Sequence, residues 1–349
     1  SSSVSTTFQD QVETKFGTIY LMDKEATYDL AIIGGGPAGV AAGVYAARKR
    51  LKTVFITKDF EGQSFVSDGI ENWIGTEKIS GPDLSASLEK HLRAYAGDIV
   101  DIRKSLWCEK ITRDLANRTF TINTISSADK STRSFTARTV LVTTGSHRRK
   151  LDVAGADTFE HKGLTYCASC DGPLFADQDV VVVGGGNAAF ESATQLLAYC
   201  KSVTLVNRSS VFRADPITVE KVLAHPKMRV IKNATPAEVK GDKFVTSFVY
   251  HDNDPQSPTN GKDVEIATTG IFVEIGSLPT TDFVKGLVEL NEYGNVVVDP
   301  RTQRAHGVGG FDGVWAAGDC SDGKYHQNNI AAGDAVKALE DIYIYIKTR

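Results

Sequence analysis

The sequence has no apolar run long enough to cross a membrane. A spanning helix needs about 20 predominantly apolar residues, and no stretch of this 349-residue chain comes near that length. Residues 1–15 are polar and lack the apolar middle of a signal peptide. These absences predict a cytoplasmic protein with no membrane partner.

Dense basic stretches are absent as well. The formal net charge is -4, and the basic pieces at 48–50 and 148–150 are short. We therefore expect no nucleic-acid partner, because such partners are bound by clustered Lys and Arg. Hydrophobic residues make up 41% of the chain and charged residues 23%, which is typical of a folded globular protein. The length favours two domains over one.

Cysteine is scarce, and the five cysteines do not suggest a disulfide framework. Cys108, Cys200 and Cys320 are isolated, whereas Cys167 and Cys170 are separated by two residues. A Cys-x-x-Cys pair is also half of a zinc site. The chain has no second half and no histidine at ligand spacing, so we expect no metal. Two thiols at this spacing can instead close a small disulfide.

A glycine-rich turn follows the apolar run at 30–33. An alanine-rich stretch continues to about residue 50, and a second apolar strand follows at 53–56. This order of strand, turn, helix and strand is the context in which G-x-G-x-x-G binds a dinucleotide, with the pyrophosphate at the helix N-terminus. The expected contacts in this loop are Gly34, Gly36, Pro37, Ala38 and Gly39.

The same pattern returns later in the chain. An apolar strand at 180–183 precedes a second glycine loop, a helix to about residue 199 and a strand at 203–206. The chain is therefore predicted to be an α/β protein with two Rossmann-like dinucleotide-binding modules. The expected contacts in the second loop are Gly184, Gly186, Asn187, Ala188 and Ala189.

Two further strand ends carry a recognisable pattern. Thr143-Thr144-Gly145 ends an apolar strand, and Ala317-Gly318-Asp319 ends another near the C-terminus. Here the sequence resembles the FAD-dependent pyridine-nucleotide disulfide oxidoreductases. The resemblance implies that the first glycine loop binds FAD and that Asp319 holds the ribityl and phosphate region of the flavin.

The position of the cysteine pair narrows the resemblance. The stretch 166–173 contains Cys-Ala-Ser-Cys-Asp-Gly-Pro and lies just before the second glycine loop. In this it is similar to the low-molecular-weight thioredoxin reductases and the related peroxiredoxin-reductase flavoproteins. The resemblance implies that Cys170 faces the flavin, that Cys167 attacks the substrate disulfide, and that Asp171 carries the proton.

The resemblance extends from about residue 28 to the C-terminus and also implies a domain plan. Both domains would be of the β-β-α flavoprotein type, with the second inserted in the first. Residues 1–147 and 275–349 would form the FAD-binding domain, and 148–274 the NAD(P)H-binding domain with the cysteine pair. The second domain would rotate about hinges near 144–151 and 271–278, and the protein would be a homodimer.

The choice of pyridine nucleotide depends on the residues after the strand at 203–206. No carboxylate stands there to bind an unphosphorylated ribose, whereas Arg208, Ser209 and Arg213 could receive a 2′-phosphate. NADPH is therefore predicted. Asn207 and Ser209 replace basic residues of the resembling reductases, so NADH, or ferredoxin as donor, remains an alternative.

Several other residues match flavin contacts of the resembling family. Two differences stand among them: Glu61 replaces a glycine, and His326 replaces a strongly basic residue. The second difference could alter the flavin potential or its pH dependence, and the alternative is that His326 is simply a surface histidine. The expected flavin contacts outside the first loop are Gly62, Gln63, Asn72, Thr144, Gly145, Gly318, Asp319, His326 and Gln327.

Together these features predict a thioredoxin reductase. Electrons would pass from NADPH through FAD to the Cys167–Cys170 disulfide, and from there to thioredoxin or a thioredoxin-like protein. A peroxiredoxin or glutaredoxin-like partner is an alternative. A dithiol oxidase or a non-catalytic redox sensor is less favoured, because neither needs both nucleotide loops together with the dithiol.

Overall fold

The computed structural model describes residues 11–13, 19–22, 27–67, 69–310 and 312–349 of the chain. Part of the polar N-terminal segment on which the sequence prediction relied lies outside these residues. The chain divides into two compact units. Unit 1 comprises residues 1–147 and 278–349, and unit 2 comprises 148–277. The boundary predicted from the sequence lies at 274/275.

Unit 1 is built on a mixed sheet whose strands run in the order β1-β2-β8-β3-β4-β5. β19 pairs with the end of β8 in parallel, and β6 and β7 extend the sheet as an antiparallel hairpin on β8. The strands are β1 Gln11–Glu13, β2 Ile19–Met22, β3 Tyr28–Ile33, β4 Thr53–Ile56, β5 Val100–Arg103, β6 Leu106–Asp114, β7 Thr119–Ser126, β8 Thr132–Val142 and β19 Val314–Ala316.

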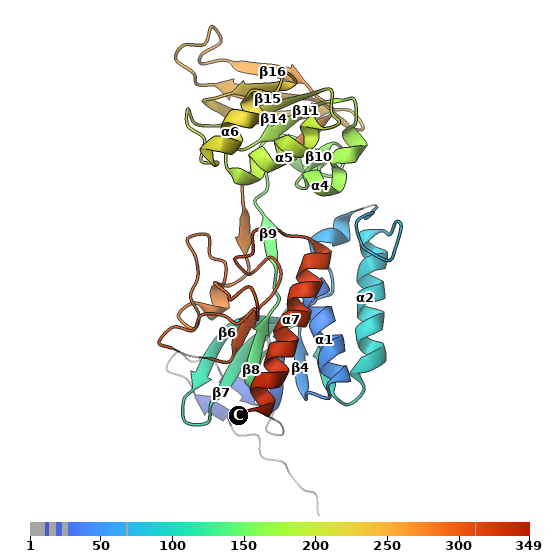
Figure 1. Ribbon diagram of the computed structural model, residues 1–349, viewed down its shortest axis with the longest axis vertical. Helices are drawn as coiled ribbons and strands as arrows, with labels where there is room; N and C mark the ends of the chain where they lie inside the picture. The colour runs from blue at the N-terminus through green and yellow to red at the C-terminus, as the bar shows by residue number, and fades with distance from the viewer. Residues whose placement is uncertain (1–10, 14–18, 23–26, 68, 311) are drawn as a thin grey trace, which may run out of the picture. The chain divides into compact units, whose positions relative to one another are not determined.

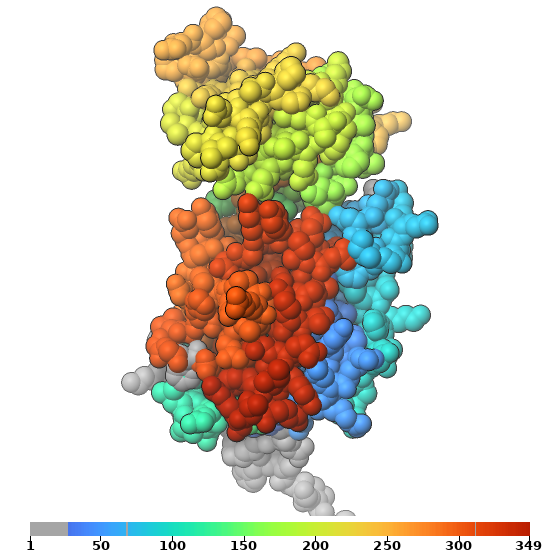
Figure 2. Space-filling view, in the orientation of Figure 1, coloured from blue at the N-terminus to red at the C-terminus, as the bar shows by residue number. Residues whose placement is uncertain are grey.

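Three helices cover one face of the sheet in unit 1. They are α1 Pro37–Arg48, α2 Gly81–Ala96 and α7 Asn328–Lys347, and they lie side by side in Figure 1. Alanine and valine on α1 pack with Phe55 and Leu92 into a buried core. Figure 2 shows that α7, in red, keeps one side at the surface. The other face of the sheet is covered by residues 283–305.

Unit 2 has a parallel sheet with the strand order β10-β17-β11-β12-β13. Its strands are β10 Leu164–Thr165, β11 Asp179–Val183, β12 Ser202–Val206, β13 Met228–Ile231 and β17 Gly270–Val273. Four valines in succession fill β11, as expected for a strand buried on both faces. The helices are α3 Ala156–Phe159, α4 Ala168–Asp171, α5 Asn187–Leu197 and α6 Pro216–Leu223.

A small antiparallel sheet completes unit 2. It consists of β14 Ala234–Gly241, β15 Val245–Asp252 and β16 Asp263–Ala267 (Figure 1). Short 3-10 turns occur at Gln63–Val66, Gly172–Phe175 and Asp282–Val284. The two segments that link the units, β9 Ser146–Arg148 and β18 Ser277–Pro279, pair with each other.

The predicted fold class is confirmed: the chain is an α/β protein with parallel Rossmann-like sheets. Each unit contains a strand, a helix and a neighbouring parallel strand in succession, β3-α1-β4 in unit 1 and β11-α5-β12 in unit 2. Within the described residues, no helix is both long and apolar enough to span a bilayer.

Candidate functional site

The first glycine loop joins β3 to α1 in unit 1. Gly34 has φ of 119°, and a Cβ atom there would lie 2.3 Å from the carbonyl oxygen of Thr143. A Cβ atom at Gly36 would meet nothing within 4 Å, and Gly36 is the N-cap of α1. The turn is therefore tight at its first glycine and open at its second. That geometry lets a pyrophosphate approach the free N–H groups at the start of the helix.

Two predicted flavin contacts, Gln63 and His326, lie against a third, Asp319. The side-chain amide of Gln63 donates to Asp319 Oδ2 at 3.0 Å, and His326 Nδ1 lies 3.3 Å from Asp319 Oδ1. The Gln63 amide also donates to the Ser146 hydroxyl at 3.2 Å. The structure therefore brings together residues that lie more than 250 positions apart in sequence, at the C-terminal ends of β8 and β19.

A second pair of predicted residues meets close by in unit 1. The Asn72 side-chain amide donates to Gln327 Oε1 at 3.1 Å, and Asn329 donates to the Asn72 carbonyl at 2.6 Å. Gln327 is the N-cap of α7. These bonds fix the segment around Asn72 to the beginning of the last helix.

Two further predicted residues of unit 1, Gly62 and Gly318, also lie near the first loop. A Cβ atom at Gly62 would be 3.9 Å from Pro37, and one at Gly318 would be 3.5 Å from Ala38. The Thr144 hydroxyl donates to the Thr280 carbonyl at 2.6 Å, which leaves its oxygen as an acceptor. The residues fit a dinucleotide, because the open loop and the polar groups share one edge of the sheet.

The second glycine loop repeats this geometry between β11 and α5. Gly184 has φ of 150°, and a Cβ atom there would lie 2.4 Å from the carbonyl oxygen of Glu274. A Cβ atom at Gly186, the N-cap of α5, would meet nothing within 4 Å. Ala189 stands in the third position and is fully buried, while Ala188 is exposed. This loop also leaves room for a pyrophosphate at a helix N-terminus.

The loop after β12 folds onto the second glycine loop. Asn207 is buried, and its amide donates to the carbonyls of Ser209 and Val211 at 2.9 and 3.1 Å. The Ser209 hydroxyl donates to Val211 at 2.7 Å, so its proton is already used. Arg208 and Arg213 are both exposed. Both guanidinium groups can donate hydrogen bonds to a ligand.

Asn187 connects the start of α5 to the start of α6. Its side-chain oxygen accepts from the backbone N–H of Asp215 at 2.9 Å, and Asp215 caps α6 by accepting from Ile217 and Thr218. The side-chain oxygen of this predicted residue is therefore engaged within the fold. Its contact with a ligand stays a prediction.

Cys167 and Cys170 form a disulfide in unit 2. Cys167 is the N-cap of α4, and Cys170 lies within that short helix, so the two Cα atoms are 5.3 Å apart. Within unit 2, Cys170 is exposed and Cys167 is half-buried. The two cysteines are therefore joined in a disulfide, and at least Cys170 lies at the surface of unit 2.

Asp171 is held next to the disulfide by Thr165. The Thr165 hydroxyl, at the end of β10, donates to Asp171 Oδ2 and accepts from the Cys167 N–H at 3.4 Å. Thr165 is 5% exposed, so this link is shielded from solvent. The sequence reasoning missed Thr165, whose position two residues before Cys167 is a weak signal.

The other three cysteines are free thiols. Cys200 and Cys320 are buried, and Cys320 donates to the Val142 carbonyl at 3.4 Å. Burial raises the pKa of the Cys320 thiol to about 11. A buried thiol of this kind is not a nucleophile at neutral pH.

Glu274 is a second residue that the sequence reasoning missed. It follows β17, is 9% exposed, and accepts from the Ser192 hydroxyl at 2.6 Å. Burial raises the pKa of its carboxyl to about 7. A signal exists in the sequence, because a glutamate directly after the apolar run Ile271–Val273 is unusual at the end of a buried strand.

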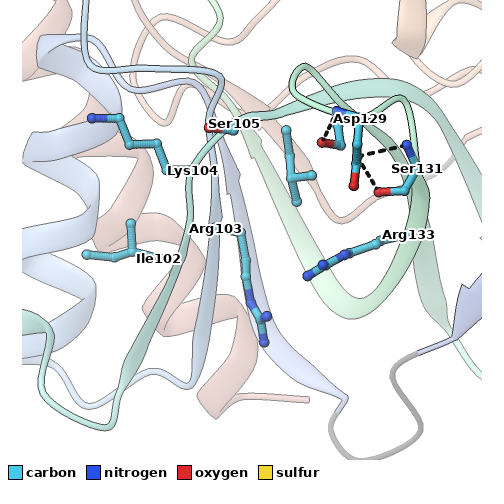
Figure 3. A pocket seen from close by; sticks show the side chains of 9 residues that line it. Ile102, Arg103, Lys104, Ser105, Asp129, Ser131 and Arg133 are labelled. Atoms are coloured by element: carbon cyan, nitrogen blue, oxygen red, sulfur yellow. Dashed lines mark hydrogen bonds between the residues drawn. The ribbon is translucent and has the colours of Figure 1, made fainter.

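A small polar pocket of about 210 Å³ lies elsewhere in unit 1 (Figure 3). Arg103 and Arg133 line it, together with the turn in which Asp129 accepts from Ser131. The Arg103 guanidinium is already paired with Asp101 at 2.7 Å. None of the predicted site residues lines this pocket.

Comparison with known proteins identifies the family to which the chain belongs. The family described as "Pyridine nucleotide-disulphide oxidoreductase" matches residues 28–335. The chain is 38% identical over 316 residues to an alkyl hydroperoxide reductase protein of Xanthomonas campestris pv. phaseoli, covering 90% of this chain and 56% of that protein. It is 35% identical over 324 residues to an NADH dehydrogenase of Bacillus subtilis (strain 168), covering 93% and 59%.

Solved structures show the same fold. Thioredoxin reductase from Giardia duodenalis superposes with a TM-score of 0.82 at 32% identity, and that from Streptococcus pyogenes MGAS5005 with 0.80 at 30%. Each match covers 93% of this chain and 100% of the other. The curated relatives are longer, and the chain spans less than six-tenths of their length.

Proposed function

Because this chain belongs to the pyridine nucleotide-disulphide oxidoreductase family, we propose that it is a flavin-dependent thioredoxin reductase that uses NADPH to reduce a small protein disulfide. The observation that carries the proposal is the Cys167–Cys170 disulfide, located in the same unit as the second glycine loop. A structural disulfide would need neither this loop nor the adjacent acid.

The residues take distinct roles in this proposal. Cys170 faces the flavin, Cys167 attacks the protein disulfide, and Asp171 holds and returns the proton that the thiols exchange. Thr165 keeps the Asp171 carboxyl oriented through its hydrogen bond. Bound FAD and the pyridine nucleotide would together supply the electron pair that opens the disulfide.

The two glycine loops hold the two dinucleotides. The loop at Gly34–Gly39 takes FAD, with Gln63, Asp319 and His326 as polar contacts at the edge of the sheet. Such a group fits because Gly36 leaves its cradle open. The loop at Gly184–Ala189 takes the pyridine nucleotide in the corresponding way.

NADPH is the proposed donor because of the loop after β12. Arg208 and Arg213 reach the surface on either side of the buried Asn207 network, and no carboxylate stands at the strand end to repel a 2′-phosphate. The Ser209 hydroxyl already donates to the Val211 carbonyl within the loop, so the preference for NADPH is assigned to the two arginines. NADH is the alternative donor.

A second candidate partner is favoured by the relatives. Several alkyl hydroperoxide reductase proteins are 35 to 38% identical to this chain. The protein could therefore reduce a thioredoxin-like or peroxide-reducing thiol protein, rather than thioredoxin itself. We also propose, by family resemblance, that it is a homodimer.

An anaerobic titration tests the function. The FAD-loaded protein is mixed with NADPH or with NADH while the yellow flavin band is followed, and thioredoxin or a peroxide-reducing thiol protein is then added as the oxidised acceptor. NADPH should bleach the flavin faster than NADH, and one acceptor should restore the band. If only dithionite bleaches the flavin, the pyridine-nucleotide donor is wrong; if neither acceptor restores it, the protein-disulfide substrate is wrong.

A further inference from the structure

Glu274 stands directly against the second glycine loop. Its backbone N–H donates to the Val183 carbonyl at 2.8 Å, and its own carbonyl is the group that a Cβ atom at Gly184 would strike. The side chain is almost entirely buried. A carboxyl group in such a place is costly unless it is paired, so its contacts need an explanation.

Only part of the bonding capacity of this carboxyl is used within unit 2. Oε1 accepts from the Ser192 hydroxyl on α5 at 2.6 Å. Oε2 lies 3.6 Å from the Arg148 guanidinium, which is too long for a direct hydrogen bond. One carboxyl oxygen therefore retains a position for another hydrogen-bonding group.

The strand order indicates which part of a dinucleotide would reach Glu274. In a doubly wound sheet the ligand lies across the carboxyl ends of the strands, with its pyrophosphate at the helix N-terminus after the first strand. That strand is β11, with β12 on one side and β17 on the other. The loop after β12 carries the arginines for the adenosine half, so the other half lies over the end of β17.

We propose that Glu274 is a positioning residue for the nicotinamide ring and that its carboxyl group binds the ring's carboxamide. The inference rests on the proposed use of a pyridine nucleotide and deepens it. A carboxamide carries both an acceptor oxygen and N–H donors. A carboxyl group at this place can therefore pair with it in either protonation state, and this would set which face of the ring is presented.

The titration behaviour of Glu274 agrees with this role. Burial is the main cause that raises its pKa to about 7, and the charge of Glu191 on α5 raises it further. Ser192 and Arg148 act in the opposite direction. At neutral pH the group is present in both forms, so it can donate to the carboxamide oxygen or accept from the amide N–H.

Binding of truncated nucleotides tests the proposal without turnover. The FAD-loaded protein is titrated calorimetrically with NADP⁺, which does not reduce the flavin, and with 2′-phospho-ADP-ribose, which lacks the nicotinamide. NAD⁺ and ADP-ribose form a second pair without the 2′-phosphate. Glu274→Met keeps the side-chain volume but forms no such hydrogen bond, Glu274→Ala serves if the methionine variant does not fold, and Glu274→Gln is the conservative variant.

The expected outcome is a loss confined to the nicotinamide-containing ligands. Glu274→Met should weaken NADP⁺ about tenfold and leave 2′-phospho-ADP-ribose within about twofold, since one hydrogen bond to a charged or polar group is lost. Glu274→Gln should stay within about threefold of the wild type for both ligands. Asp263→Asn, an exposed carboxylate on β16, is the matched control and should change neither.

Two results would overturn the inference and one would remove its basis. If Glu274→Met weakens both members of a pair equally, the residue supports the loop and does not position the ring. If it weakens neither, Glu274 has no part in binding. If the wild-type protein binds none of the four ligands, the pyridine-nucleotide function is wrong and the inference falls with it.

Discussion

The two glycine loops share one backbone arrangement and differ in the side chains around it. A Cβ atom on the first glycine would collide with the carbonyl of a neighbouring strand end in both units, at Thr143 in unit 1 and at Glu274 in unit 2. The Thr143 hydroxyl donates to the Ile33 carbonyl and is neutral, whereas Glu274 carries a titratable carboxyl. The common backbone explains why each loop can hold a dinucleotide. In the proposed function, the differing side chains would distinguish the two ligands.

The middle glycines show the same relation. A Cβ atom at Gly35 would lie 2.5 Å from the Thr57 hydroxyl, and one at Gly185 would lie 2.3 Å from the Asn207 side-chain oxygen. In each unit the residue after the second strand of the module therefore packs under the loop. In unit 2 this residue is an amide that organises the loop carrying the two arginines, whereas in unit 1 it is a threonine whose hydroxyl donates to the Asp59 carbonyl.

The largest expected effect is the loss of acceptor reduction when the disulfide is removed, with both nucleotide loops left intact. Cys170→Ser should abolish reduction of the protein acceptor, because the serine hydroxyl forms no disulfide, while reduction of the flavin by NADPH continues. Stopped-flow absorbance with and without acceptor measures both steps. The matched variant Cys200→Ser, at a buried free thiol, should retain acceptor reduction. A Cys170→Ser protein that reduces the acceptor at the normal rate would contradict the mechanism.

Glycine substitution tests whether the loops have separate ligands. At Gly34 and at Gly184 an alanine needs a strained positive φ and collides with a carbonyl oxygen, which costs roughly 3 kcal/mol or more. Gly34→Ala should lose FAD on gel filtration, and Gly184→Ala should keep FAD but bind NADP⁺ at least about tenfold more weakly. Loss of both ligands from either variant would mean that the loops are not independent.

The pH dependence of stability should distinguish Glu274 from Thr143. The pKa of Glu274 is about 7 in the folded chain against an ordinary value of 4.5, so between these values the folded state binds more protons than the unfolded state. The contribution of Glu274 to stability is therefore present below pH 4.5 and is lost as pH rises to about 7. Relative to Glu274→Gln, the wild type should lose roughly 3 kcal/mol over this window.

Urea unfolding at a series of pH values measures this difference. The free energy of unfolding of Glu274→Gln minus that of the wild type should increase with pH. Thr143→Val, at the corresponding position of unit 1, should show a difference that does not vary with pH, since no titratable group is removed. A pH-independent difference for Glu274→Gln would show that its pKa is not raised.

The arginines after β12 should set the nucleotide preference. Arg208→Ala removes a charge-assisted hydrogen bond to the 2′-phosphate, and it should weaken NADP⁺ about tenfold to 100-fold while leaving NAD⁺ nearly unchanged. Calorimetric titration with both nucleotides gives the ratio. Lys201→Ala, beside the same sheet but paired with Asp179, is the control. Equal weakening of NADP⁺ and NAD⁺ would argue against a 2′-phosphate contact.

The smallest effect is expected at Thr165. Thr165→Val keeps the shape but removes the donor to Asp171, and it should slow acceptor reduction about fivefold. Thr165→Ser should restore the rate. If valine and serine behave alike, the hydroxyl has no part in placing Asp171.

The sequence allowed the modules to be predicted because their signals are local. β4 begins and ends where the apolar run at 53–56 does, and both glycine loops lie between a strand and a helix as expected. The start of the last helix has no such signal: it begins at Asn328, where Gln327 is extended and its carbonyl accepts from the backbone N–H of Ala331. The family indicated by the motifs is confirmed.

The rest of the site depends on contacts between distant segments. Ser146 meets Gln63 across 83 positions, and Glu274 meets Ser192 across 82. Glu274 reaches its loop only because β17 pairs with β11, a pairing that no local pattern specifies. Such residues can be identified only once the strand order is known, whereas the glycines and cysteines can be identified from their spacing in the sequence.

A count of free thiols tests the central claim most directly. Before reduction, alkylation of the denatured protein should modify three cysteines, because Cys167 and Cys170 are joined. After anaerobic treatment of the FAD-loaded protein with excess NADPH, mass spectrometry should find all five cysteines modified. If the flavin is bleached but only three cysteines are modified, electrons do not reach the disulfide. The proposed path from the pyridine nucleotide to Cys167 and Cys170 would then be wrong.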